Sequence, residues 1–150
     1  MKMTQFPEIT SLIPHRPPML LVDRVFDVGD TSGVVLATVA PDHLFLRRDG
    51  TLEPQTYCEL IAQGFGACEA VRRQQKGLTI HGGGFLVSLR DMQFLALAHA
   101  QEELTIKTTK VDECFDTYIV RGEVYRQDTL LAQGTIYIYV WKGDTPPQKL

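Results

Sequence analysis

The stretch LEPQTYCELIAQGFGACEAVRRQQ, residues 52–75, decides the fold that we expect for this chain of 150 residues. Its apolar positions recur at helical spacing and form one stripe. The stripe consists of Tyr57, Leu60, Ile61, Gly64, Cys68 and Val71. Pro54 is tolerated only in the first turn of a helix, so it marks where the helix begins. The sequence therefore predicts one long helix over about residues 52–75.

The opposite face of this helix is small or polar and almost uncharged. It carries Gln55, Glu59, Ala62, Gln63, Gly66 and Ala70. Glu59 is the only ionisable group on this face before Arg73 in the last turn. Helices at a protein surface normally carry charged residues on their outer face. We therefore expect the helix to be buried on both sides, by its own sheet and by the second subunit of a dimer.

Strand patterns flank the helix in the sequence. Residues 19–28 and 34–40 are rich in strand formers and surround a turn with two glycines, which predicts a hairpin. Four strand patterns follow the helix, over residues 84–97, 102–111, 116–126 and 130–141. Short turns separate the last three, so we expect an antiparallel meander. The predicted fold class is α+β, a single domain over residues 1–150 in which an antiparallel sheet curls round one helix.

The composition excludes several classes of protein. With 15 Lys+Arg against 18 Asp+Glu, the net charge of -3 argues against a nucleic-acid-binding module. Three cysteines without a CxxC pair predict free thiols, and four scattered histidines show no ligand spacing, so we expect no metal and no cofactor. No segment has the length of a membrane span or the apolar core of a signal peptide, so we expect a cytoplasmic protein.

Two segments resemble the β-hydroxyacyl-acyl-carrier-protein dehydratases of the hotdog fold. LIPHRPPMLLVDRV (12–25) looks like their N-terminal signature, and CELIAQGFGA (58–67) is similar to the Glu-Ala-x-Ala-Gln stretch of their central helix. FLVSLRDMQFLALAHAQEELTI (85–106) is similar to the strand pair that follows. The form PHxxPMLLVD, with DGxL and ELxAQ after it, resembles the divergent dehydratases of aryl polyene clusters. The resemblance implies a hotdog fold, with a sheet wrapped round one long central helix.

The resemblance also implies a reaction, the removal of water from a 3-hydroxyacyl thioester of acyl carrier protein or coenzyme A. This reaction needs a base for the C2 proton and an acid for the departing 3-hydroxyl. Glu59 matches the glutamate of the family, and desolvation on its helix face favours the protonated form that an acid requires. Gln63 lies one turn further on and is placed to hold the Glu59 carboxyl group.

The histidine of the family has no direct counterpart. It belongs to a Gly-His-Phe-Pro motif that this sequence lacks, and its position falls on Phe45. The glycine N–H that binds the thioester carbonyl falls on Pro54, which has no N–H to give. His43 and His15 are the two candidates for the base, and a different hotdog subunit could supply it instead.

Further residues are candidates for contacts with the substrate and its carrier. The substrate candidates are Gln63, Gly66, Gly83, Gly84 and Phe85. Arg47, Arg48, Arg72, Arg73 and Lys76 flank the helix ends, either as ordinary solvated charge or as a rim for an acidic carrier protein. Three functions remain open, because the fold does not decide between them. They are a dehydratase, as a homodimer or a heterodimer, a hotdog thioesterase that uses Glu59, and a non-catalytic partner subunit.

Overall fold

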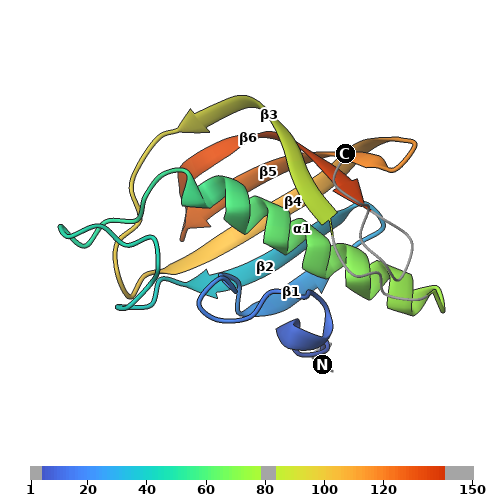
Figure 1. Ribbon diagram of the computed structural model, residues 1–150, viewed down its shortest axis with the longest axis horizontal. Coiled ribbons are helices and arrows are strands. Elements are labelled where there is room, and N and C mark those ends of the chain that lie inside the picture. Colours follow the sequence, from blue (N-terminus) through green and yellow to red (C-terminus); the bar gives the residue numbers. More distant parts are fainter. Residues whose placement is uncertain (1–4, 79–83, 141–150) are drawn as a thin grey trace, which may run out of the picture.

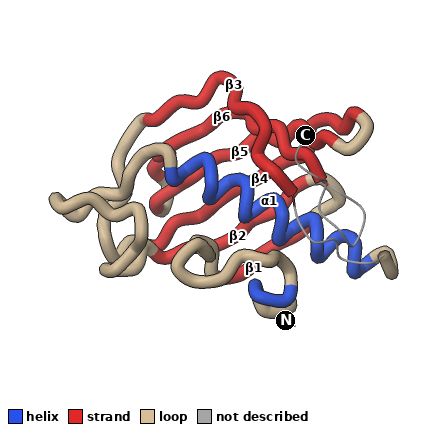
Figure 2. The backbone as a smooth tube through the Cα atoms, in the orientation of Figure 1, coloured by secondary structure: helices blue, strands red, loops and turns tan. Residues whose placement is uncertain are grey.

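The computed structural model describes residues 5–78 and 84–140 of the chain. A six-stranded antiparallel sheet, in the order β1-β2-β4-β5-β6-β3, curls round the single long helix α1 (Figures 1 and 2). The elements are the short 3-10 helix η1 (Ile9–Ser11), β1 (Arg24–Val28), β2 (Ser32–Thr38), α1 (Thr56–Gln75), β3 (Gly84–Phe94), β4 (Glu103–Cys114), β5 (Thr117–Arg126) and β6 (Thr129–Val140). This arrangement confirms the predicted α+β class and hotdog fold.

The helix begins at Thr56, four residues later than the sequence predicted. Leu52 does not enter the helix, because its N–H donates to the carbonyl of Ala98 at 2.9 Å and it forms a bridge with Leu46. Pro54 lies in the turn just before the helix, where its carbonyl accepts the N–H of Tyr57 at 3.0 Å. The proline therefore marks the turn that starts the helix and is not itself a helical residue.

The apolar stripe of α1 packs against the concave side of the sheet, as predicted. All six of its residues are buried. Close approach depends on glycine at one strand position, because a Cβ on Gly122 of β5 would collide with the side chain of Ile61. On the helix itself, a Cβ on Gly64 would come within 3.2 Å of Ile106 in β4. The helix and the sheet thus form one core with little space between them.

The predicted hairpin and meander are both present, with changed limits. β1 pairs with β2, and β4, β5 and β6 are neighbours in sequence and in the sheet. Leu21 does not extend β1, because its N–H donates to the Gln63 side chain, whereas the Asp23 N–H still donates to the Leu36 carbonyl of β2 at 2.9 Å. The first strand begins at Arg24.

Strand β3 is one edge of the sheet and pairs with β6 on its other side. Most of its residues are exposed on both faces of the strand. Its exposed large apolar side chains are Phe85, Leu86, Val87, Leu89 and Phe94. A long apolar edge strand is a site at which another sheet can pair. In the described residues, no helix is long and apolar enough to cross a membrane.

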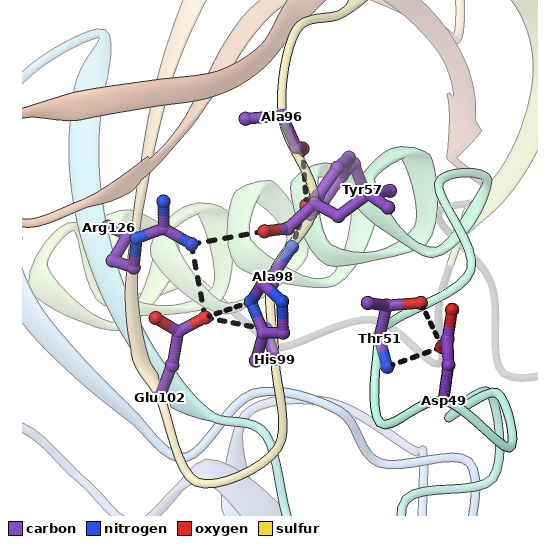
Figure 3. A network of polar contacts seen from close by, with 9 residues as sticks. Asp49, Thr51, Tyr57, Ala96, Ala98, His99, Glu102 and Arg126 are labelled. Atoms are coloured by element: carbon purple, nitrogen blue, oxygen red, sulfur yellow. Dashed lines mark hydrogen bonds and ion pairs between the residues drawn. The ribbon is translucent and has the colours of Figure 1, made fainter.

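A polar network holds the loop between β3 and β4 against the start of α1 (Figure 3). The Tyr57 hydroxyl donates to the carbonyl of Ala96 at 2.9 Å and accepts the N–H of Ala98 at 2.7 Å. The Glu102 carboxylate accepts the N–H of His99 at 2.6 Å and a guanidinium N–H of Arg126 at 3.1 Å. Burial raises the pKa of Tyr57, so this hydroxyl stays protonated as a donor.

Candidate active site

Glu59 lies on the outer face of α1, in the first turn of the helix. Its side chain is 32% exposed, so it is less buried within this chain than the sequence predicted. Its Oε1 accepts a hydrogen bond from Gln63 Nε2 at 3.0 Å and lies 3.8 Å from His15 Nε2. A carboxyl group, an amide and an imidazole therefore meet at one point on the helix.

The N-terminal segment covers part of this outer face. Gln63 accepts the Leu21 N–H at 2.9 Å and donates to the Met19 carbonyl at 2.8 Å, which ties this segment to the helix. A Cβ on Gly66 would lie 3.6 Å from Ile13, so the segment also passes close to the glycine. The second surface that the sequence predicted is thus, in part, the chain's own segment from Leu12 to Leu21.

A pocket of about 110 Å³ opens between this segment, the helix and strands β3 and β6. Its lining residues are Leu12, Ile13, Pro14, His15, Glu59, Ala62, Gln63, Phe65, Gly66, Glu69, Ala70, Arg73, Gly84, Leu86, Ile138 and Val140. Along α1, Glu59 with His15 beside it lies at one end of the pocket, Glu69 and Arg73 lie toward the other, and Gln63 lies between them. An apolar wall with a few polar groups is typical of a small-molecule site.

A second hollow begins on the other side of Glu59. Its lining residues are Gln55, Cys58, Glu59, Leu86, Leu89, Met92 and Phe94. Glu59 and Leu86 border both spaces. The second hollow is bounded by exposed apolar residues of the edge strand β3, and Glu59 stands between it and the first pocket.

The two candidate histidines lie in different environments. His43 Nδ1 accepts the N–H of Phe45 at 3.1 Å, and burial lowers the pKa of its imidazole. Within residues 5–78 and 84–140, no contact joins His43 to Glu59, whereas His15 is 3.8 Å away. The Nδ1 atom of His15 is buried and has no hydrogen-bond partner in the described part of the chain. The structure therefore brings His15, and not His43, to the carboxyl group.

The five substrate candidates separate into three groups. Gln63, Gly66 and Gly84 line the first pocket, and Phe85 lines neither space although it is half exposed. Gly83 lies outside the described residues. A Cβ on Gly84 would approach Ile138 at 2.9 Å, so this glycine permits close pairing with β6.

One of the five basic residues predicted to form a rim for a carrier protein is buried and does not belong to such a rim. Arg72 is 4% exposed, and its guanidinium binds Glu69 at 3.0 Å and the Ser32 carbonyl at 3.0 Å. It cannot meet a carrier protein, because its position on the helix turns it toward the β1–β2 turn. Arg73 lines the end of the first pocket, Lys76 is exposed beyond the helix, and Arg47 and Arg48 lie in the loop before it.

The cysteines are free, as predicted, with Cys58 and Cys68 buried and Cys114 exposed. Burial raises the pKa of the Cys58 thiol and raises that of Cys68 to about 12, so neither is an activated nucleophile. Among the residues that the structure describes, no group of three or more potential ligands is placed to hold a metal ion.

Sequence reasoning missed the backbone groups of Met19 and Leu21 and the pocket wall formed by Leu86 and Ile138. Residues 19–23 have an ordinary strand pattern, which hid their contact with the helix. Gln63 was the available signal, since a polar residue on a buried helix face needs partners. Nothing in the sequence says which backbone groups those partners are.

An antiparallel sheet wrapped round one long helix defines the hotdog class of proteins, and in this chain a carboxyl group of the helix lies at a pocket. The family model described as "ApeP-like: ApeP dehydratase" matches residues 7–147. The chain therefore belongs to the ApeP-like dehydratase family and is a dehydratase-like protein of the hotdog fold.

Individual proteins are similar to this chain in sequence or in fold. The 3-hydroxyacyl-[acyl-carrier-protein] dehydratase FabZ of Streptococcus pyogenes serotype M5 (strain Manfredo) is 26% identical over 133 residues, which cover 86% of this chain and 93% of the relative. The dehydratase heterocomplex ApeI:P from Xenorhabdus doucetiae contains a chain of similar fold, with a TM-score of 0.85 and 22% identity over 92% of this chain and 93% of that one. A hypothetical thioesterase with coenzyme A from Streptococcus pneumoniae TIGR4 is less similar, with a TM-score of 0.60 and 18% identity over 79% of this chain and 84% of that one.

Proposed function

We propose that this protein removes water from a 3-hydroxyacyl thioester, with Glu59 as the acid and His15 as the base. The observation that carries the proposal is the approach of His15 Nε2 to Glu59 Oε1, 3.8 Å, at the mouth of an apolar pocket. An acid and a base for elimination must reach groups on neighbouring carbon atoms, so they have to lie close together. Membership of a dehydratase family supports the same reaction.

In the proposed reaction the neutral His15 imidazole takes a proton from C2 of the acyl chain. The Glu59 carboxyl group gives its proton to the 3-hydroxyl, the C3–O bond breaks, and water leaves. The electron pair of the C2–H bond becomes the double bond between C2 and C3. His15 is then cationic and Glu59 anionic, and transfer of a proton between these neighbours restores both groups.

A second hotdog subunit, paired at the edge of β3, would complete the site. Exposed apolar side chains of this strand border the hollow beside Glu59, so a subunit placed there would remove them from water. Pro54 offers no N–H to the thioester carbonyl, so a donor from the partner would fill that role. The similar chain from Xenorhabdus doucetiae belongs to a dehydratase heterocomplex, which supports a partner of different sequence.

The thioester is proposed to be carried by an acyl carrier protein. Arg73 borders the end of the first pocket and Lys76 follows on the exposed helix end, so both can meet an acidic partner. Charge reversal at Lys76, which lines neither space beside Glu59, should raise KM for the carrier-linked substrate and leave KM for a pantetheine thioester unchanged. Equal KM values for the carrier-linked substrate in wild type and variant would remove this part of the proposal.

One assay tests the reaction itself. The protein, alone and with candidate hotdog partner subunits, is incubated with a 3-hydroxyacyl carrier thioester, and the mass of the product is followed. The proposal expects loss of water with the thioester intact. Release of the free acid would indicate a thioesterase instead. No turnover with any partner would indicate a non-catalytic subunit.

A further inference from the structure

The carboxamide of Gln63 uses both of its N–H donors and accepts one hydrogen bond inside the protein. The residue is 2% exposed. Oε1 accepts the Leu21 N–H at 2.9 Å, and Nε2 donates to the Met19 carbonyl at 2.8 Å and to Glu59 Oε1 at 3.0 Å. Gln63 was a substrate candidate, but this bonding leaves its amide engaged by the protein.

The two backbone partners fix the orientation of this amide. A backbone N–H can only donate and a backbone carbonyl can only accept, so Oε1 must face Leu21 and Nε2 must face Met19. The second hydrogen on Nε2 then points to Glu59. Because an amide NH₂ group offers only hydrogens, Oε1 of Glu59 has to act as the acceptor.

This bonding has a consequence for the acid. While Oε1 of Glu59 accepts from Gln63, the hydrogen of the protonated carboxyl group belongs on Oε2. The same amide holds the segment that carries His15, through Met19 and Leu21. One side chain therefore controls both the orientation of the acid and the position of the base.

We propose that Gln63 is the positioning residue of this site: it directs the acid proton of Glu59 to Oε2 and sets the distance between Glu59 and the segment that bears His15. The inference rests on the proposed dehydration. It assigns Gln63 no contact with the reacting atoms, so its loss should lower kcat and leave KM nearly unchanged.

Two substitutions separate positioning of the acid from anchoring of the segment. Gln63→Met keeps the length of the side chain and removes every hydrogen bond, so we expect kcat to fall by about 10-fold or more, as for one lost hydrogen bond to a charged group. Gln63→Glu keeps an acceptor for the Leu21 N–H, and the introduced carboxyl group can donate to Glu59 only while protonated. Its activity relative to wild type should therefore fall as the pH rises.

Amide hydrogen exchange at Leu21 reports the anchoring independently of activity. Exchange should accelerate in Gln63→Met and stay near the wild-type rate in Gln63→Glu, with both variants measured below their melting temperatures. A residue that only anchors the segment would change the pH profile of Gln63→Glu only at those pH values where exchange at Leu21 also changes, because the bond to the Met19 carbonyl needs the same proton. That result, or a wild-type kcat in Gln63→Met, would overturn the proposal.

A second measurement distinguishes failure of this inference from failure of the proposed reaction. In Glu59→Gln, the side-chain NH₂ resonances of Gln63 should move, while exchange at Leu21 stays unchanged. If the wild-type protein dehydrates no substrate, the proposed reaction fails, and these resonances still report whether Gln63 donates to Glu59. Unmoved Gln63 resonances in Glu59→Gln would contradict the bonding on which the inference depends.

Discussion

Nε2 of His15 lies 3.8 Å from Oε1 of Glu59, although one residue belongs to a proline-rich loop and the other to a helix. The two side chains are 33% and 32% exposed, so both are reachable from solvent. Gln63, which donates to Glu59, also bonds Met19 and Leu21 of the segment that carries His15. A single chain thus brings together the two groups that we propose as acid and base.

Matched substitutions distinguish which of the two candidate histidines is the base. His15→Gln should lower kcat/KM for dehydration by about 10²-fold or more, the usual contribution of a general base. His43→Gln should stay near wild type, because the His43 ring contacts Phe45 and not Glu59. Steady-state rates on one 3-hydroxyacyl thioester decide the matter, and a large loss in His43→Gln with full activity in His15→Gln would reverse the assignment.

Two glycines of α1 test how the helix is rotated against the sheet. Gly66→Ala should raise the free energy of unfolding, by up to about 1 kcal/mol, because its Cβ would lie 3.6 Å from Ile13 and alanine favours a helix. Gly64→Ala should be the less stable of the two, since its Cβ would lie 3.2 Å from Ile106. Urea denaturation measures both, and the helix propensity gain cancels in the comparison. The opposite order of stability would contradict the observed rotation.

Tyr57→Phe tests the network at the start of the helix. The change leaves the buried N–H of Ala98 without its acceptor, so we expect a loss of about 1–3 kcal/mol in the free energy of unfolding. Tyr125→Phe is the control, because its hydroxyl donates to the Glu123 side chain in a less buried position. Denaturation midpoints that do not differ between the two variants would argue against a structural role for Tyr57.

Loss of charge should lower the stability of the protein much more at Arg72 than at Lys76. Arg72→Met leaves the Glu69 carboxylate and the Ser32 carbonyl without their buried partner, so we expect destabilisation by about 3–5 kcal/mol. Lys76→Met changes an exposed residue and should alter stability little. Thermal melts of both variants test this, and equal melting temperatures would show that the Arg72 contacts contribute nothing.

Much of the fold was predictable because it follows from local patterns. Apolar residues at every third or fourth position located the stripe of α1 that faces the sheet. Strand patterns separated by short turns located the meander of β4, β5 and β6. The predicted start of the helix was wrong, because the Leu52 N–H donates to the carbonyl of Ala98, which is distant in the sequence. No local pattern contains such a contact.

The site was less predictable than the fold. Arg72 and Arg73 are adjacent and chemically identical, yet one helical step buries the first and leaves the second at the pocket. Glu59 is the only ionisable group on its helix face before Arg73, and the resemblance to the dehydratase family implied its role as the acid. The choice between His15 and His43 depends on how the N-terminal segment crosses that helix. Nearness to the expected motif favoured His43, and nearness in space favours His15.

The most direct test of dehydration with Glu59 as the acid is single-turnover dehydration by Glu59→Gln, with wild type and Glu53→Gln measured beside it. Glu53 precedes the helix and lines neither of the spaces beside Glu59, so its substitution controls for loss of one carboxyl group. We expect Glu53→Gln to form the enoyl thioester at the wild-type rate, and Glu59→Gln to be slower by about 10²-fold or more while still folded. Dehydration by Glu59→Gln at the wild-type rate would contradict the proposed role of Glu59 as the acid.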